Sequence, residues 1–199
     1  MTVVERFSVA TRADWVSGPG QGHWTYNHYV ALQKDGHRYE IVDGVLYMSP
    51  SPSEPHQSAA GWFYHYMLLH VQIPGLGRTY IAPLDVELAP NTVVQLDVFV
   101  MLNAGRGKIT SSRIVGAPDL VIEISSPTTV GYDRREKQDA YARARVSEYW
   151  IIDTTAQVVE VLLLEGRGYH SQGLFTSQMG LLSQIVPSIV DVSIEKFFL

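Results

Sequence analysis

The sequence predicts an α/β fold in which a central mixed sheet is flanked by helices. The segment 117–153 reads as strand, loop, helix and strand. Its first strand, expected over Asp119–Ser126, is apolar on both sides except for Glu123. Such a strand is normally covered on both faces, as in the middle of a sheet between layers. A second strand of this type, Val93–Leu102, contains Asp97 as its one acid.

The helix after Glu123 is expected to begin near Asp133, because Glu136 follows three residues later at the spacing of a capping box. Residues three or four positions apart share one face of a helix. On this helix the face toward the sheet is small or apolar and carries one cation. It consists of Lys137, Ala140, Tyr141 and Ala144. Lys137 is therefore expected to point inward, toward Glu123.

The remaining elements are predicted from periodicity and turn residues. Asp43-Gly44 joins two β-type runs and is typical of a hairpin. In the first half we expect a helix from Thr25 to about Lys34, strands Arg38–Val42 and Val45–Ser49, a helix His56–Val71 and a strand Thr79–Leu88. In the second half we expect a loop over 103–116, one long strand from Glu148 to about Leu164 that bends near Thr154, and a strand Tyr169–Phe175.

One domain is predicted after a short lead-in. Residues 1–22 end in SGPGQG, and glycine and proline at that density indicate a flexible segment. The domain is therefore expected over 23–199, without an internal repeat or linker. At 199 residues the chain is long enough for one substantial core.

Composition excludes several classes of site. The chain has no cysteine, which excludes disulfides, zinc–thiolate sites and cysteine nucleophiles, and a cytoplasmic location is expected. No segment resembles a signal peptide or a membrane span. No phosphate-binding loop or dinucleotide fingerprint is present, so no nucleotide cofactor is expected. The net charge of −5 argues against a dedicated nucleic-acid binder, but not against an enzyme that holds a divalent metal in an acidic pocket.

Asp97 and Glu123 are the candidate metal ligands. Each is a single acid in a buried strand, where a charge is costly unless a cation meets it. Mg²⁺ or Mn²⁺ takes carboxylate oxygens as ligands, so the pair suits such an ion. Lys137 is then the candidate to stabilise charge or to orient the attacking water. The alternative is a buried ion network without catalysis.

Further side chains are candidate substrate contacts. Gln95 would share a strand face with Asp97 by the two-residue alternation of a strand. Arg134 and Arg135 belong to a local basic patch suited to phosphates, with a solvated helix face as the alternative. Tyr141, one turn further along the same helix than Lys137, is counted with these contacts and would hold Lys137 in place, with packing in the core as the alternative.

Several motifs together resemble one known family. Val-Ile-Glu at 121–123 lies between Ala-Pro-Asp-Leu and Ser-Ser-Pro-Thr-Thr. Tyr-Asp-Arg-Arg-Glu-Lys follows at 132–137, and the segment 141–153 ends in Ser-Glu-Tyr-Trp-Ile-Ile-Asp. Earlier matches are Arg38–Gly44, Ser49–Pro52 with His56, and Leu96–Val98. From about Trp24 to Leu164, the chain resembles the Uma-two family of restriction-endonuclease-like proteins, within the PD-(D/E)XK nuclease superfamily.

The resemblance implies a restriction-endonuclease-like fold with a metal site at Asp97 and Glu123. Superfamily members usually carry a lysine two residues after the second acid, but here that position is Ser125, which we assign to substrate contact. Lys137 matches a lysine that the family carries on the following helix. The family commonly has proline before the aspartate, where this chain has Leu96.

Two more site residues follow from the resemblance alone. Glu40 matches an acid that the superfamily often keeps to assist metal binding, and the alternative is an exposed strand carboxylate. His56 matches a position at the start of the long helix. There it would bond a carboxylate, touch the substrate, or only stabilise the helix end.

These observations predict a Mg²⁺-dependent endonuclease that hydrolyses phosphodiester bonds in DNA. A homodimer is expected, because cutting both strands of a duplex needs two centres. The alternative is a catalytically inactive protein that keeps the nuclease fold and acts as a binding or scaffold module, as the acidic net charge favours. A hydrolase acting on a small phosphate or sugar is a third possibility, which no sequence motif supports.

Overall fold

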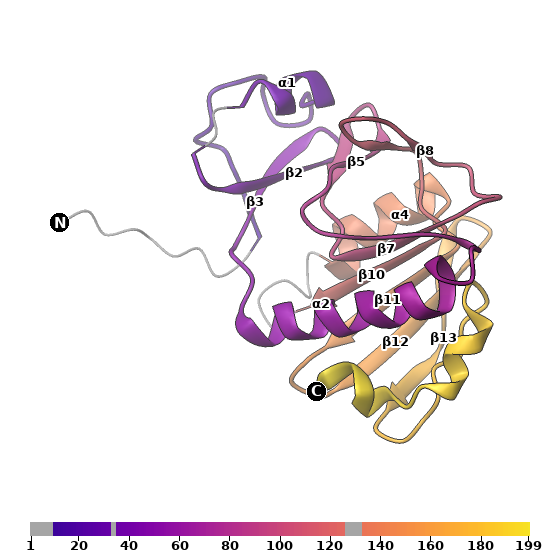
Figure 1. Cartoon of the computed structure of the whole chain (residues 1–199). Coiled ribbons are helices and arrows are strands. Elements are labelled where there is room, and N and C mark those ends of the chain that lie inside the picture. The colour runs from indigo at the N-terminus through magenta and orange to yellow at the C-terminus, as the bar shows by residue number, and fades with distance from the viewer. Residues whose placement is uncertain (1–9, 33–34, 126–132) are drawn as a thin grey trace.

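Two mixed β-sheets organise the chain, and the computed structural model describes residues 10–32, 35–125 and 133–199 (Figure 1). The larger sheet has the order β13-β12-β11-β10-β7-β4. Its strands are β4 Gly77–Ile81, β7 Val98–Leu102, β10 Leu120–Ser125, β11 Glu148–Asp153, β12 Val158–Glu165 and β13 Gly168–Thr176. The strands β10 and β11 are parallel, and the other pairs are antiparallel. The predicted α/β class with a mixed sheet is confirmed.

The second sheet has seven strands but is the smaller, because its strands are short; among the described residues its order is β1-β3-β2-β6-β5-β9-β8. Its strands are β1 Thr11–Arg12, β2 Arg38–Val42, β3 Val45–Ser49, β5 Val86–Ala89, β6 Thr92–Val94, β8 Lys108–Ile109 and β9 Ile114–Val115. The predicted hairpin is present as β2 and β3, with both Asp43 and Gly44 at positive φ. The segment 103–116, which the sequence predicts as loop, thus contains the short strands β8 and β9.

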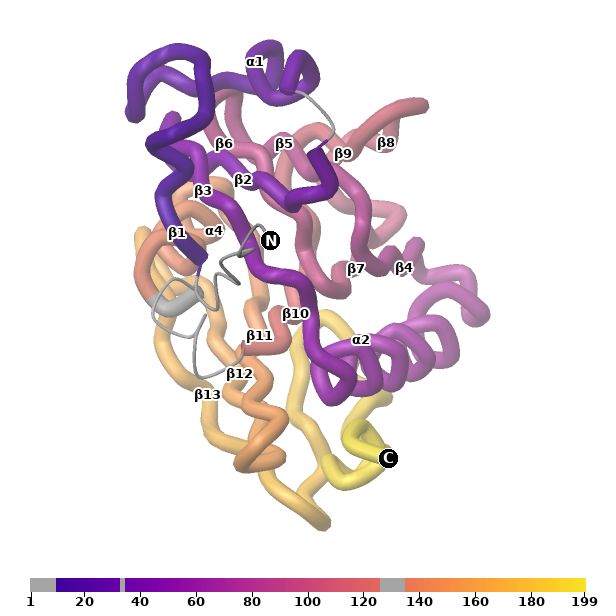
Figure 2. Tube along the Cα trace, turned by 90° about the vertical axis from the view of Figure 1, so that its left-hand side faces the viewer, coloured from indigo at the N-terminus to yellow at the C-terminus, as the bar shows by residue number. Residues whose placement is uncertain are grey.

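Helices cover both faces of the larger sheet, as Figure 2 shows. The helix α2, Glu54–Met67, continues as a π-helical turn over Leu68–Gln72 and packs on one face with the 3₁₀ helices Pro187–Asp191 and Ile194–Phe198. The helix α4, Gln138–Ala144, follows a π-helical turn over Asp133–Lys137 and packs on the other face. The helix α1 spans only Tyr26–Val30 and ends earlier than predicted.

Two predicted strands each divide into two pieces that belong to different sheets. The run Thr79–Leu88 becomes β4 and β5, separated by the cis peptide Ala82–Pro83. A β-ladder does not run through Pro83, because proline has no N–H to donate. The run Val93–Leu102 likewise becomes β6 and β7, with 95–97 outside either strand. The chain therefore crosses from one sheet to the other within each of these two runs.

A third predicted strand is also two strands. The run Glu148–Leu164 forms an antiparallel hairpin of β11 and β12. The chain turns at the predicted place, because Asp153 accepts the amides of Thr155 and Ala156 and closes an Asx-type turn. The bend expected near Thr154 is in fact a complete reversal.

Residues 10–22 form ordered contacts with the smaller sheet, although the sequence pattern there is that of a flexible lead-in. The strand β1 pairs with β3. Ala13 is fully buried and packs with Trp24. The side chain of Gln21 accepts the amide of Leu46. These contacts connect 10–22 to the smaller sheet, and the domain boundary at residue 23 stays a prediction.

Candidate active site

Asp97 and Glu123 lie beside each other where the two sheets meet. The strands β7 and β10 are antiparallel with Val98 opposite Ile122, so Asp97, just before β7, comes next to Glu123. The amide of Ile124 donates to Asp97 Oδ2 at 2.9 Å. Only 6 % of Asp97 and 3 % of Glu123 are exposed. The fold therefore places two carboxylates in a buried location.

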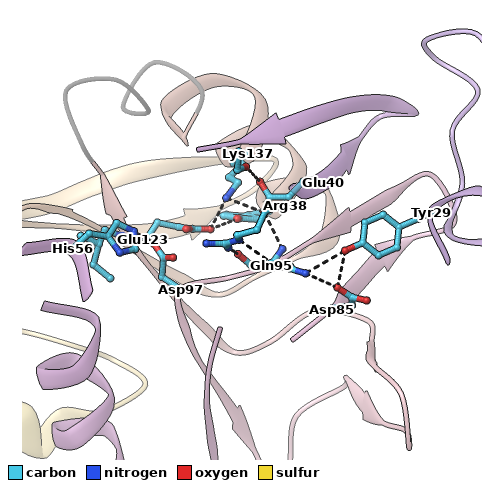
Figure 3. Close-up of polar contacts among 12 residues, drawn as sticks. Tyr29, Arg38, Glu40, His56, Asp85, Gln95, Asp97, Glu123 and Lys137 are labelled. Atoms are coloured by element: carbon cyan, nitrogen blue, oxygen red, sulfur yellow. Dashed lines mark hydrogen bonds and ion pairs between the residues drawn. The ribbon is translucent and has the colours of Figure 1, made fainter. Parts of the chain in front are cut away.

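Lys137 reaches both sheets from the π-helical turn before α4. Its Nζ lies 3.1 Å from Glu123 Oε1 and 3.2 Å from Glu40 Oε1 (Figure 3). The side chain is 6 % exposed. The inward direction expected from helical spacing is thus present in the fold, and the ammonium lies between two acids.

Glu40 is the third acid of this cluster and comes from β2 of the smaller sheet. It is 1 % exposed, so it is not a solvated strand carboxylate. Its Oε1 accepts the amide of Gln95 at 2.8 Å, and its Oε2 accepts the hydroxyl of Ser49 at 3.3 Å. We call Glu40, Asp97, Glu123 and Lys137 the acidic cluster.

Tyr141 holds one of these acids in place. Its hydroxyl donates to Glu123 Oε1, the same oxygen that Lys137 contacts. Burial, together with the charge of Glu123, raises the pKa of Tyr141 well above its ordinary value. The phenol therefore stays protonated and remains a hydrogen-bond donor to the carboxylate.

His56 holds the other acid. Its Nε2 lies 3.1 Å from Asp97 Oδ2. Burial by itself raises the pKa of Asp97, but the hydrogen bond and charge of His56, the charge of Lys137 and the amide of Ile124 outweigh it, so the pKa is lowered. Asp97 is therefore kept ionised. Within the described part of the chain, His56 Nδ1 is buried without a hydrogen-bond partner.

The residues predicted to contact the substrate lie in different surroundings. Gln95 lies between β6 and β7 and not on a strand face shared with Asp97. Ser125 is buried on the same face of β10 as Glu123. Arg135 is exposed, and the side chain of Arg134 lies outside the described residues.

A polar network that no sequence motif indicates extends from the acidic cluster toward α1. The side-chain amide of Gln95 donates to Tyr29 and to Asp85, and its carbonyl accepts from Arg38. Figure 3 shows this network continuing from Glu40 to Tyr29. The one available signal was the two-residue spacing of Arg38 and Glu40, which places both on one face of β2.

A comparison of the chain with models of protein families identifies its family. A model of the Uma2 family, described as "Putative restriction endonuclease", matches residues 26–194. The chain belongs to the Uma2 family. The resemblance noted in the sequence is therefore confirmed, and the restriction-endonuclease-like fold is expected of a Uma2 protein. No curated protein matches the chain.

A solved structure supports the same fold for this Uma2 chain. It is the crystal structure of a "putative nuclease belonging to DUF820" from Anabaena variabilis, with 19 % identity and a TM-score of 0.70. The match covers 88 % of this chain and 97 % of that one. At this identity the comparison shows the fold alone. In the described residues, no helix is long and apolar enough to cross a membrane.

Proposed function

We propose that this Uma2 protein is a divalent-metal-dependent endonuclease that hydrolyses phosphodiester bonds in DNA. The observation that carries the proposal is the convergence of Asp97, Glu123 and Lys137 in one buried location at the meeting of two sheets. Family membership favours a reaction on nucleic acid. The acids and the lysine are the residue types that this reaction needs.

The donor chemistry of the acidic cluster suits a hard divalent cation. No group of three or more His, Cys, Asp or Glu among the described residues is arranged as a complete metal site. Mg²⁺ does not need one, since it binds through one or two carboxylates and completes its shell with water and substrate phosphate. Asp97 and Glu123 would hold the ion. When bound, it would polarise a phosphoryl oxygen and lower the pKa of a water molecule.

The protein residues would divide the remaining work. The ammonium of Lys137 would stabilise charge on the phosphate or orient the attacking water. Tyr141 fixes the Glu123 carboxylate, and His56 fixes Asp97, so both acids are preorganised. Glu40 contacts Lys137 from the smaller sheet. The exposed Arg135 and its neighbour Arg134 remain candidate contacts to the DNA backbone.

The experiment is cleavage of supercoiled plasmid with Mg²⁺ or Mn²⁺ as the only divalent ion. Glu123→Gln and Lys137→Met are expected to lower the rate about a hundredfold or more, while Lys108→Met, which changes an exposed lysine, leaves it unchanged. Circular dichroism checks that each variant is folded. Cleavage at the wild-type rate by all variants would contradict the proposal.

The alternative function is that of a binding or scaffold module without catalysis. The observation that favours it is the position of Lys137 between Glu40 and Glu123, where its ammonium already neutralises part of the site. Calorimetric titration with Mn²⁺ separates the two functions. Binding by the wild type that is lost in Asp97→Asn favours the nuclease, whereas absent binding in both favours the scaffold.

The homodimer expected from the resemblance remains a prediction. A nuclease that cuts both strands of a duplex would bring together two copies of the acidic cluster. Sedimentation of the protein with and without duplex DNA measures the mass directly. A monomer in both conditions would leave only single-strand nicking.

A further inference from the structure

Arg38 stands beside the acidic cluster in the fold. It lies on β2 two residues before Glu40, so the two side chains project from the same face of the strand. Arg38 is half-buried. Two residues, Gln95 and Glu40, connect Arg38 to the proposed catalytic lysine by hydrogen bonds and an ion pair (Figure 3).

In the part of the chain that the structure describes, the guanidinium of Arg38 is hydrogen-bonded by one residue, Gln95. Its Nε donates to Gln95 Oε1 at 3.1 Å, and its Nη2 donates to the backbone carbonyl of Gln95 at 3.4 Å. Gln95 is itself held in place. Its backbone amide donates to Glu40, and its side-chain nitrogen donates to Tyr29 and Asp85. The side chain of Gln95 is therefore used within the protein, and it orients the arginine.

Although Glu40 projects from the same face of β2, the charge of Arg38 takes part in no ion pair among the described residues. Within the described ranges, no carboxylate lies within ion-pairing distance of its guanidinium, whereas Arg113 pairs with Glu87 and Arg143 pairs with Asp43. Gln95 takes up Nε and one N–H of Nη2, which leaves N–H groups on Nη1 and Nη2. An adjacent pair of arginine N–H groups matches two oxygens of a phosphate.

We propose that Arg38 binds a backbone phosphate of the nucleic acid at the acidic cluster, and that Gln95 positions its guanidinium. The inference rests on the proposed function and adds the group that meets the substrate's negative charge. An acidic cluster alone repels a phosphate, so a fixed cation on its edge meets a requirement of the chemistry. Gln95, predicted as a substrate contact, becomes a positioning residue.

The test is binding of a fluorescein-labelled duplex, measured by anisotropy over a range of salt concentrations. Ca²⁺ replaces Mg²⁺, because it takes the same oxygen ligands but polarises bound water less. Arg38→Met is expected to weaken binding about tenfold and to lower the salt slope by about one. Arg38→Lys keeps the charge and should retain the slope with part of the affinity. Arg167→Met, at an exposed arginine in the β12–β13 turn, is the matched control.

A double-mutant cycle tests the role of Gln95. Gln95→Leu should weaken binding several-fold in the wild type and have no further effect in Arg38→Met, because its action passes through the arginine. A purely structural role of Gln95 would give the same loss in both backgrounds. Thermal melts of all variants identify any loss of fold, and Arg38→Lys remains informative if Arg38→Met does not fold.

The outcomes separate this inference from the proposed function. If the wild type binds and cleaves DNA while Arg38→Met has the affinity and salt slope of Arg167→Met, the role of Arg38 is overturned and the nuclease proposal stands. If the wild type neither binds nor cleaves, both are overturned. A loss of DNA affinity that is confined to Arg38→Met and Gln95→Leu supports the inference.

Discussion

Asp97 and Glu123 are neighbours with different partners. Asp97 accepts a backbone amide and lies against His56, whereas Glu123 accepts from Tyr141 and Lys137. An ionised carboxylate is stable in a buried place only when such donors compensate its lost hydration. Asp97, whose pKa is lowered, is therefore ready to bind a cation without first losing a proton.

The lowered pKa of Asp97 predicts how metal-free stability depends on pH. A carboxyl with a lowered pKa in the fold contributes stability above its unfolded pKa of about 3.9, and this is lost as pH falls through the folded pKa. In EDTA, Asp97→Asn should therefore melt below the wild type at pH 7. The difference in melting temperature between the wild type and Asp97→Asn should shrink as the pH falls below about 4.

The control for this measurement is Asp191→Asn, at an exposed aspartate. Its melting temperature should follow that of the wild type at every pH. A gap between wild type and Asp97→Asn that stays constant from neutral to acid pH would show that ionisation of Asp97 does not stabilise the fold.

At the scale of elements, β11 is tied to the C-terminal segment by a buried acid outside the candidate site. Glu148 is fully buried and accepts Trp150 Nε1 at 2.6 Å through Oε1. Its Oε2 accepts the amides of Gln184 at 2.9 Å and Ile185 at 3.1 Å. Gln184 and Ile185 lie outside the helices and strands, and the Glu148 carboxylate accepts their backbone amides. Glu148 therefore fixes how the C-terminal 3₁₀ helices cover the sheet.

Glu148→Ala should destabilise the protein by about 3 kcal/mol, because buried donors lose their acceptor. For a chain of this size, that corresponds to a fall in melting temperature of roughly 6–12 °C. Calorimetry measures it. Glu165→Ala is the control, since the side chain of Glu165 is 74 % exposed, and its melting temperature should hardly change. Equal effects of both changes would contradict the role given to Glu148.

At the scale of the whole molecule, the two sheets share one hydrophobic cluster. Val86 and Val94 of the smaller sheet pack in it with Phe99 and Val121 of the larger sheet and with Tyr141 of α4. Among the described residues, short connections between the sheets also run from β4 to β5, from β6 to β7, from β7 to β8 and from β9 to β10. Shared packing and short connections of this kind favour a single cooperative unit.

We therefore predict that both sheets unfold together in urea. In protein labelled with 5-fluorotryptophan, the ¹⁹F signals of Trp24, in the cluster of the smaller sheet, and Trp150, in the larger sheet, should lose their native intensity at one midpoint. Single Trp→Phe variants assign the signals. Two separate midpoints would mean that the smaller sheet forms its own unit.

Local pattern was enough to predict that Glu123 and Lys137 lie against each other. A lone acid in an apolar strand and a lone cation on the apolar face of a helix are costly to bury apart, so Glu123 and Lys137 were expected to meet. They do meet in the fold. Glu40 and His56 came only from the resemblance, because neither position is distinguished by periodicity.

The sequence by itself determined the α/β class, the β2–β3 hairpin, the buried strand around Glu123 and the inward face of α4, because each depends on neighbours a few residues apart. Only the tertiary structure decided that the run 93–102 divides between two sheets and that Gln95 turns away to hold Arg38. Those outcomes depend on partners more than fifty residues away in the chain, and hydrophobic periodicity carries no information about such pairings.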